Sequence, residues 1–426
     1  VASRGLGDVY KRQPDDAAAF MAQHVNRFPE GTWVDPCCGT GVLAWHLARK
    51  VDGDVGGFVA KQLILVDIDP VALHTAVVLL SHFLAPGDTA GFEALAARCV
   101  VADFLHDDIP AHDFVIMNPP YASTARDDTF ATAATRDLFA YFMERVATTS
   151  RGFIAVTPAS YLGAPKFAGL RLLVDEHLTG GDITVFDNVP DTLFRGYKFG
   201  SSNTSKTNFV RAAVTVCPPG ASAWRVTPIL RWRAASRAAL LAKAPHLLAP
   251  RQIGPGGEWL KIHPDHQEIW WQMQGWQRTI ADLVVPGPTE FSLTVATTPR
   301  YYISAAFGEL SRRSKQVLHF ATAHDRDLAA VTLNSSAPYL WWRWHDGGVS
   351  LTRRVLMSVP VPDIEPVLIS DIRASERDNL VTKLNAGIIN ENVKHPFALV
   401  ERLNRVVFGR DVDVAAAYAQ DLTQAP

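Results

Sequence analysis

The chain has 426 residues, of which 48% are hydrophobic and 20% charged, a composition typical of a globular protein with room for two domains. No apolar run is long enough to span a bilayer, and no secretory signal is recognisable. The four cysteines, at positions 37, 38, 99 and 217, match neither a metal-ligand spacing nor a disulfide framework, which fits a reducing cytoplasm.

The net charge of −2 hides an asymmetry along the chain. Residues 1–180 contain 14 Lys and Arg against 21 Asp and Glu, whereas residues 181–426 contain 27 against 22. A mildly basic second part is suited to following a phosphate backbone, while the acidic first part is suited to another kind of ligand.

The first thirteen residues, "VASRGLGDVYKRQ", differ in character from everything downstream. We interpret residues 1–13 as a non-native segment, similar to the adapter-derived strings found at the ends of gene models, and leave them out of the fold prediction. On that interpretation the natural protein is truncated at this point. The alternative is a natural N-terminus that is basic and disordered.

Residues 14 to about 180 alternate between strand-like and helix-like segments. The expected strands are TWVD, LILVD, CVVAD, FVIMN and GFIAVT, and the expected helices are PDDAAAFMAQHV, VLAWHLARKV, PVALHTAVVLLSHFL and TRDLFAYFMERVAT. This alternation predicts an α/β fold with a doubly wound, mostly parallel sheet. DITVFDNV and NFVRAAVTV follow without a clear helix between them, so we expect them to close the sheet as an antiparallel pair.

The stretch CPPGAS, residues 217–222, is the best candidate for a domain boundary, because a proline pair and a glycine follow the last expected strand. We therefore predict a catalytic domain over 14–219 and a second domain over 220–426. The second part holds most of the tryptophans, irregularly spaced among many prolines, and predicts an α+β domain in which most tryptophans fill the core.

Three successive strands each end in a residue suited to binding an adenosine. Gly39 and Gly41 in DPCCGTG let the backbone approach a ligand at the start of a helix. Asp67 ends the next strand, where a carboxylate can accept hydrogen bonds from ribose hydroxyls. Asp103 ends the third and can accept from an adenine amino group, with Phe104 placed to stack on the ring. Each aspartate alone is more often a turn cap, but together the residues predict an adenosine pocket.

The ligand of this pocket is either a dinucleotide or S-adenosylmethionine. The glycine loop does not match GxGxxG, and a sulfonium needs no pyrophosphate cradle. Asp35, an acidic residue beside the loop, also suits a positively charged ligand better than a phosphate. We therefore expect S-adenosylmethionine and no metal.

The stretch NPPY follows the buried strand FVIM and holds two polar side chains on a stiff turn. Prolines cannot donate to a strand ladder, so Pro119 and Pro120 end the strand. The Asn118 side chain and the Pro119 carbonyl can accept hydrogen bonds from the two N–H groups of an adenine N6, which frees the nitrogen lone pair for methyl transfer. Tyr121 can stack on the ring. Inside a duplex such a base must first be flipped out.

Over residues 14 to about 216, the chain resembles the gamma class of N6-adenine DNA methyltransferases. The stretches that match this family's motifs, in the family's order, are QPDDAAAFM, DPCCGTGVLA, LVDIDP, VADF, NPPY, RDLFAYFMERV, FIAVTPASYL and VFDNVPDTLF. The resemblance implies a Rossmann-like sheet that binds S-adenosylmethionine, with Pro14, Pro36, Ile68 and Asn118 added to the cofactor contacts. Gln13 stands where that family has threonine. The resemblance also implies an aromatic residue against the flipped base, for which Phe194 is the candidate and Tyr197 and Phe199 are competitors.

The family consists of modification enzymes of restriction–modification systems, which implies double-stranded DNA as partner, a separate endonuclease as a further candidate partner, and a role in restriction–modification or phage defence. We expect a cytoplasmic, nucleoid-associated enzyme; the sequence leaves its oligomeric state open and favours a monomer. The stretches LNSSAPYLWWRW and SLTRRVLMSVPVPD resemble, more loosely, the end of a target-recognition region. We therefore expect residues 220–426 to form a DNA target-recognition domain.

Three alternatives remain open. One is a protein glutamine methyltransferase, since that group also uses NPPY on an amide nitrogen; its shorter members lack a large C-terminal domain, and Pro36 favours the DNA class. Another is an RNA adenine methyltransferase. The third is a catalytically silent module that gives a partner its DNA specificity.

Overall fold

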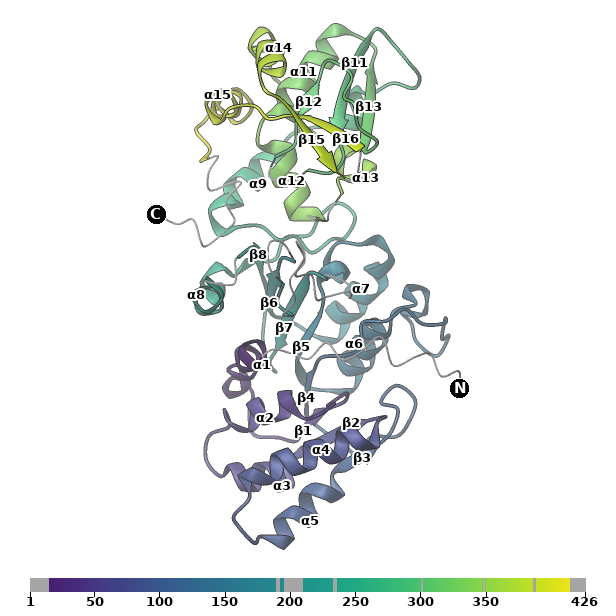
Figure 1. Ribbon diagram of the computed structural model, residues 1–426, viewed down its shortest axis with the longest axis vertical. Coiled ribbons are helices and arrows are strands. Elements are labelled where there is room, and N and C mark those ends of the chain that lie inside the picture. Colours follow the sequence, from purple (N-terminus) through teal and green to yellow (C-terminus); the bar gives the residue numbers. More distant parts are fainter. Residues whose placement is uncertain are drawn as a thin grey trace. The chain divides into compact units, whose positions relative to one another are not determined.

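The structure is a computed structural model that describes residues 15–188, 192–194, 210–232, 236–299, 302–346, 348, 350–385 and 388–413. Pro14, Tyr197 and Phe199 lie outside the described residues, as do residues 1–13. The chain divides into two compact units, the first formed by residues 1–260 with 421–426 and the second by residues 261–420 (Figure 1).

Unit 1 is built on a nine-stranded sheet with the order β3-β2-β1-β4-β5-β7-β6-β8-β9. The strands are Trp33–Asp35 (β1), Leu63–Asp67 (β2), Cys99–Val101 (β3), Phe114–Met117 (β4), Gly152–Pro158 (β5), Gly181–Phe186 (β6), Ala212–Cys217 (β7), Trp224–Leu230 (β8) and Ala249–Pro250 (β9). Strands β1 to β5 are parallel, and β7 runs antiparallel between β5 and β6. The expected α/β fold is confirmed, including the closing antiparallel pair.

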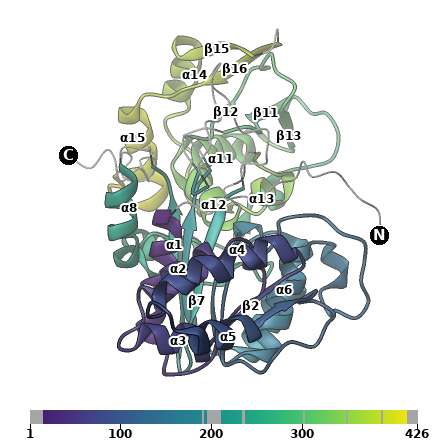
Figure 2. The same ribbon diagram turned by 60° about the horizontal axis from the view of Figure 1, so that its bottom comes forward.

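Helices cover both faces of this sheet (Figure 2). They are Asp15–Ala22 (α1), Val42–Ala48 (α2), Val55–Lys61 (α3), Pro70–Leu80 (α4), Thr89–Ala97 (α5), Leu138–Thr149 (α6), Ala168–His177 (α7) and Arg237–Lys243 (α8). Alternate residues of β4 enter two separate cores: Phe114 and Ile116 pack with α1 to α4, whereas Val115 and Met117 pack with α6 and α7. The continuous apolar run of β4 therefore reflects burial on both faces.

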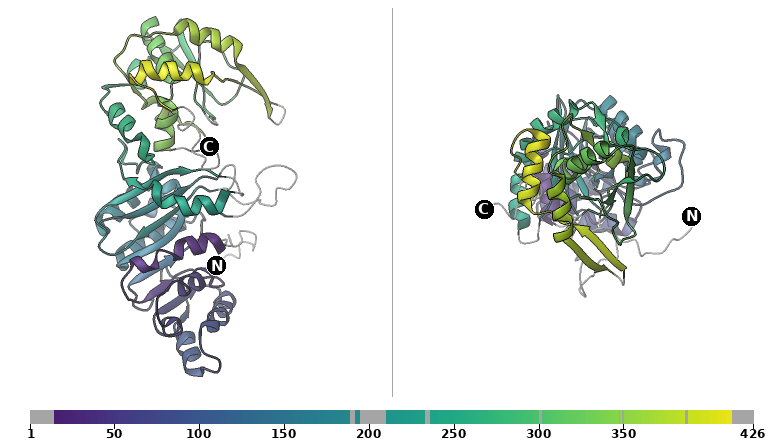
Figure 3. Two further views of the ribbon diagram at one scale, coloured as in Figure 1. Left: turned by 90° about the vertical axis from the view of Figure 1, so that its left-hand side faces the viewer. Right: turned by 90° about the horizontal axis from the view of Figure 1, so that it is seen from above.

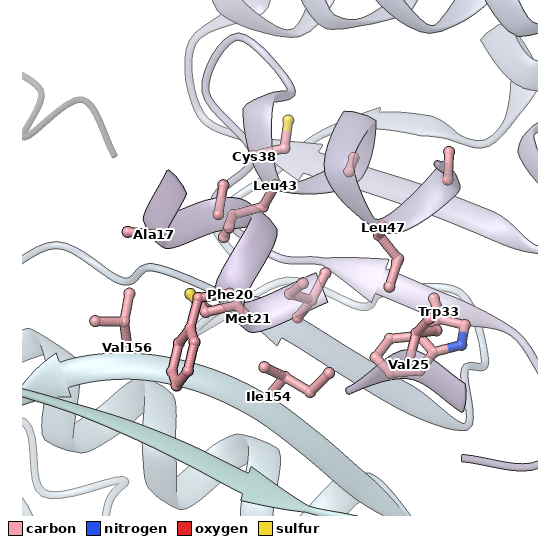
Figure 4. Packing of buried hydrophobic residues seen from close by; sticks show 14 of the residues in the cluster. Ala17, Phe20, Met21, Val25, Trp33, Cys38, Leu43, Leu47, Ile154 and Val156 are labelled. Atoms are coloured by element: carbon pink, nitrogen blue, oxygen red, sulfur yellow. The ribbon is translucent and has the colours of Figure 1, made fainter. Parts of the chain in front are cut away.

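Helix α1 lies against the central strands. In Figure 4 its Phe20 and Met21 side chains lie close to Ile154 and Val156 of β5. Phe20 also meets Phe186 of β6 edge-on, with ring centroids 5.8 Å apart. The helix that follows the N-terminal segment is thus fixed to the part of the sheet where the antiparallel strands begin.

The boundary between the two units lies further along the chain than the stretch CPPGAS, residues 217–222, where we expected it. Strand β8 pairs in parallel with β6, and β9 pairs with β8, so residues 224–250 complete the sheet of unit 1. The boundary lies at 260/261 instead of 219/220. Pro218, Pro219 and Gly220 form a turn between two strands of one sheet, which is an equally ordinary place for such residues.

Unit 2 combines helices with small antiparallel sheets, as expected of an α+β domain. Its helices are Gln267–Gln274 (α9), Ile280–Leu283 (α10), Ala323–Asn334 (α11), Ala337–His345 (α12), Arg353–Met357 (α13), Ile369–Asp378 (α14) and Phe397–Phe408 (α15). Its strands are Arg278–Thr279 (β10), Phe291–Ala296 (β11), Ala305–Ala306 (β12), Lys315–Phe320 (β13), Pro360–Val361 (β14), Leu380–Asn385 (β15) and Ile388–Val393 (β16).

The core of unit 2 contains most of its tryptophans, as predicted: Trp270, Trp341, Trp342 and Trp344 are buried, whereas Trp271 is exposed and Trp276 half-buried. Trp270 stacks on Trp341 with ring centroids 5.5 Å apart and meets Trp344 edge-on. The hairpin β15–β16 projects from the helices of this unit (Figure 3). Across the described ranges, no helix has both the length and the apolar character needed to cross a membrane.

Candidate active site

The expected site residues gather at one edge of the sheet in unit 1. Strands β3, β2, β1 and β4 are neighbours and parallel, so their carboxyl ends lie side by side. Asp35 and Asp67 are the last residues of β1 and β2, while Asp103 and Asn118 follow β3 and β4. This edge is where ligands bind in open parallel sheets.

The glycine loop between β1 and α2 is held close to the neighbouring elements. Gly39 and Gly41 both have positive φ angles, 51° and 83°. A Cβ atom on Gly41 would lie 2.9 Å from the Cβ of Ala76 in α4, so the close approach of α2 to α4 also requires glycine. The Gly39 N–H donates to Asp67 Oδ2 at 2.7 Å. Asp67 thereby fixes the loop as well as standing at the end of β2.

Asp35 is the most perturbed acid at this edge. Asp35 is 1% exposed, its Oδ1 accepts a hydrogen bond from the Cys37 N–H at 3.4 Å, and its Oδ2 has no hydrogen-bond partner among the described residues. Burial raises the pKa of Asp35 to about 8, helped by the charge of Asp67 and opposed by the Cys37 N–H. A buried carboxyl with an unpaired oxygen, next to a second carboxylate, is suited to receiving a cationic group.

The turn after β4 presents Asn118 beside the glycine loop. Asn118 is half-buried, Pro119 is buried and Pro120 is exposed. Burial raises the pKa of the Cys37 thiol well above its usual value, and the charges of Asp35 and Asp67 raise it further, whereas an interaction with the backbone N–H of Asn118 lowers it. Contact between Cys37 and the Asn118 backbone joins the loop of β1 to the turn of β4. The amide side chain of Asn118 has no recorded hydrogen bond among the described residues.

Tyr121, the last residue of NPPY, is anchored to strand β5. Its hydroxyl donates to the Val156 carbonyl of β5 at 2.9 Å, and burial raises the pKa of the hydroxyl, so it stays protonated. Its ring meets that of Phe194 edge-on, with centroids 5.8 Å apart and an interplanar angle of 70°. The two aromatic residues expected to contact a base are therefore neighbours, although 73 positions separate them in the sequence.

Ile68, Asp103 and Phe104 occupy different environments. Ile68 is 72% exposed and offers an apolar surface after β2. Asp103 is exposed, and its Oδ1 accepts from the Leu105 N–H at 2.9 Å, which is the turn-cap arrangement. Phe104 is only 2% exposed and stacks on Phe142 of α6 with centroids 5.4 Å apart. The structure therefore brings Ile68 and Asp103 to the accessible edge and places Phe104 in the core.

Two groups at this edge have structural roles that the sequence does not indicate. The Val156 carbonyl orients Tyr121, and the Cys37 thiol meets the Asn118 backbone. The first is a main-chain atom of an ordinary strand. The second is one of two adjacent cysteines, which the sequence marks only as small thiols beside the loop.

Comparison with known proteins identifies the kind of domain. Residues 6–140 match the family model described as "Methyltransferase small domain". A curated relative, Ribosomal RNA small subunit methyltransferase C of Idiomarina loihiensis, is 28% identical over 124 residues, which make up 29% of this chain and 31% of that protein. The chain thus matches less than a third of that relative's length.

Two solved structures are similar at low identity. The cryo-EM structure of a DrdV–DNA complex has a TM-score of 0.48 and 13% identity, covering 69% of this chain and 36% of that chain. The crystal structure of the type I restriction enzyme EcoKI M protein has a TM-score of 0.38 and 14% identity, covering 68% and 61%.

The sheet order, the glycine loop and the family match together define the class: unit 1 contains an α/β, Rossmann-like methyltransferase domain. The resemblance seen in the sequence is confirmed at this level. The substrate, the methylated atom and the roles of single residues belong to the proposal that follows.

Proposed function

We propose that the chain is a DNA adenine methyltransferase that transfers a methyl group from S-adenosylmethionine to N6 of an adenine flipped out of duplex DNA. The observation that carries the proposal is the position of Asn118: it directly follows β4, and its backbone N–H meets Cys37 of the glycine loop. Tyr121, three residues further on, meets the ring of Phe194. We propose further that the chain acts within a restriction–modification system, with a separate endonuclease as a further partner.

The residues at the edge of the sheet fit the proposed cofactor. S-adenosylmethionine supplies a methyl group on a cationic sulfur. Asp35, with its unpaired buried Oδ2, favours a cation close to the loop. Asp67 ends β2 with a carboxylate and Ile68 follows it with an exposed apolar side chain, which suits a ribose and an adenine ring. Pro14, Pro36 and Asp103 are proposed as further contacts, and Phe104 reaches the pocket only by leaving its contact with Phe142.

The proposed chemistry uses two acceptors and two aromatic rings. The side-chain oxygen of Asn118 and the carbonyl of Pro119 accept from the two N6–H groups, which weakens the delocalisation of the lone pair into the adenine ring. Pro119 and Pro120 keep both acceptors fixed, since proline restricts its own φ and the residue before it. Tyr121, anchored through its hydroxyl, and Phe194 pack against the extrahelical base.

The direct test is to measure which polymer receives the methyl group. We expect labelled methyl from S-adenosylmethionine to enter duplex DNA at N6 of adenine, at positions that methylation-aware sequencing of DNA from expressing cells then maps. RNA is the second candidate, because the curated relative is named as a ribosomal RNA methyltransferase. Label in RNA or in protein glutamine, with none in DNA, would contradict the proposal.

A group of basic side chains in unit 2 is suited to contacting DNA phosphates. Lys315 begins β13, opposite Ala296 of β11, and Arg353 donates to the neighbouring Gln316 at 3.4 Å. Leu351 binds the Thr297 carbonyl, which brings the start of α13 to this end of the sheet. We name this group the β13 basic cluster; it consists of Arg312, Arg313, Lys315, Arg353 and Arg354.

Neutralising part of the β13 basic cluster should weaken DNA binding without altering the methylated sequence. We expect Arg313→Gln with Arg353→Gln, both on exposed residues, to lower DNA affinity and reduce the slope of log K against log salt by about 2, because each lost phosphate contact removes about one released counterion. Fluorescence anisotropy at several salt concentrations measures both quantities. The matched control is Arg402→Gln with Arg405→Gln on α15, which should leave the slope unchanged.

A further inference from the structure

We propose that Arg237 is a positioning residue that ties the cofactor side of the active site to the target-base side. The inference rests on the proposed function, because it concerns how the base-contacting Phe194 is held. Arg237 is the first residue of α8 and lies in unit 1, far along the chain from both groups that it joins.

The Arg237 guanidinium bridges two separate segments. It forms a bidentate ion pair with Asp16 in the first turn of α1: Nη2 donates to Oδ1 at 2.9 Å and Nε to Oδ2. It also donates through Nη1 to the Thr192 carbonyl at 3.2 Å and through Nη2 to the Leu193 carbonyl at 2.8 Å. The side chain is 12% exposed, so these contacts are largely shielded from water.

Both segments lead directly to proposed active-site residues. Helix α1 begins at Asp15, next in sequence to Pro14, the proposed cofactor contact. Thr192 and Leu193 immediately precede Phe194, whose ring meets that of Tyr121. A single planar group therefore fixes the start of α1 relative to the backbone that carries Phe194.

An apolar layer surrounds this clamp and makes the arrangement rigid. Leu193 and Leu240 are buried in the core that includes Phe20 of α1, and Phe194 packs against that core. Trp232, before α8, meets Phe186 edge-on with centroids 5.7 Å apart. The apolar contacts hold α1, residues 192–194 and α8 together but are not directional. The four hydrogen bonds of Arg237 are directional and therefore fix the positions of these segments relative to one another.

The inference predicts that Arg237 couples cofactor binding to base capture. In the wild type we expect S-adenosylhomocysteine to tighten binding of target DNA, measured by anisotropy, and to increase the fluorescence of 2-aminopurine at the target position. In Arg237→Gln we expect the DNA affinities with and without S-adenosylhomocysteine to differ by no more than about twofold. We also expect kcat to fall about tenfold or more, with a smaller change in KM for the cofactor. Arg237→Lys, which keeps the charge but not the fork, should be intermediate.

Asp16→Asn should repeat the defect, and combining it with Arg237→Gln should add little, because both changes break one bridge. The matched control is Arg225→Gln, which removes another bidentate pair, to Asp182 at the opposite end of β6, and should keep the coupling. The inference would be overturned if a folded Arg237→Gln variant kept the coupling and kcat of the wild type. The same holds if folded Arg237→Lys and Asp16→Asn variants both kept them. It would also be overturned if Arg225→Gln lost coupling and kcat as much as Arg237→Gln does. A wild type that methylates no adenine would instead overturn the proposed function, and this inference with it.

Discussion

Replacing Asn118 by alanine is expected to lower the rate of methyl transfer by about 100- to 1,000-fold, the range seen when one acceptor or donor for a developing charge is removed. Affinity for cofactor and DNA should change little, because the proposed hydrogen bonds matter most when the nitrogen becomes nucleophilic. The backbone of the turn should survive the change, since the Cys37 contact involves the Asn118 main chain and the two prolines remain. Single-turnover methylation assays measure the rate of methyl transfer, and separate binding assays measure the affinities for cofactor and DNA.

Asn118→Asp should be milder than Asn118→Ala, because a carboxylate oxygen can still accept from N6–H. Asn26→Ala is a matched control: Asn26 is exposed and lines a cavity with Gly31 and Trp33 at the amino end of β1, opposite the site. A parallel fall in DNA or cofactor affinity in Asn118→Ala would mean that Asn118 binds and does not activate. Unchanged transfer in that variant would show that the amide has no catalytic role.

The sequence predicted the first part of the fold well, for a local reason. Each parallel strand is a short apolar run between helical periods, and motifs at strand ends must share one edge of the sheet. Asp35, Asp67, Asp103 and Asn118 were therefore found together from chain order alone. The choice of Phe194 as a second aromatic residue for the base depended on the family resemblance, and its contact with Tyr121 was not predicted, since no local pattern links positions so far apart.

What the sequence left out depends on tertiary packing. The pairing of β8 with β6 extends the sheet beyond CPPGAS, and no composition change marks it. Phe104 follows a strand, as a stacking residue should, yet neighbouring Phe142 buries it. Arg237 and Asp16 are ordinary charged residues on helices more than 200 positions apart, so only the folded structure shows their bridge.

Asp35 is expected to make the free protein less stable as pH rises, and this cost should disappear in Asp35→Asn. The folded pKa is about 8, above the value of 3.8 expected when the chain is unfolded. Between these values the native state holds a proton that the unfolded state has released, so the free energy of unfolding falls by about 1.4 kcal/mol per pH unit. Below about pH 4 the side chain is neutral in both states, and above about pH 8 the cost is constant.

Urea unfolding of wild type and Asp35→Asn, compared between pH 5 and pH 8, isolates this slope, because the two proteins share all other titrating groups.

Over the same pH range, S-adenosylmethionine should bind the wild type more tightly as pH rises, since a cationic ligand favours the ionised carboxylate. Asp35→Asn should bind more weakly at pH 8 and lack that additional pH dependence, while titration of the cofactor itself affects both proteins equally. Identical stability slopes would show that Asp35 is ionised in the free protein. Identical affinities would remove it from the cofactor site, even though its buried Oδ2 has no partner in the part of the chain that the structure describes.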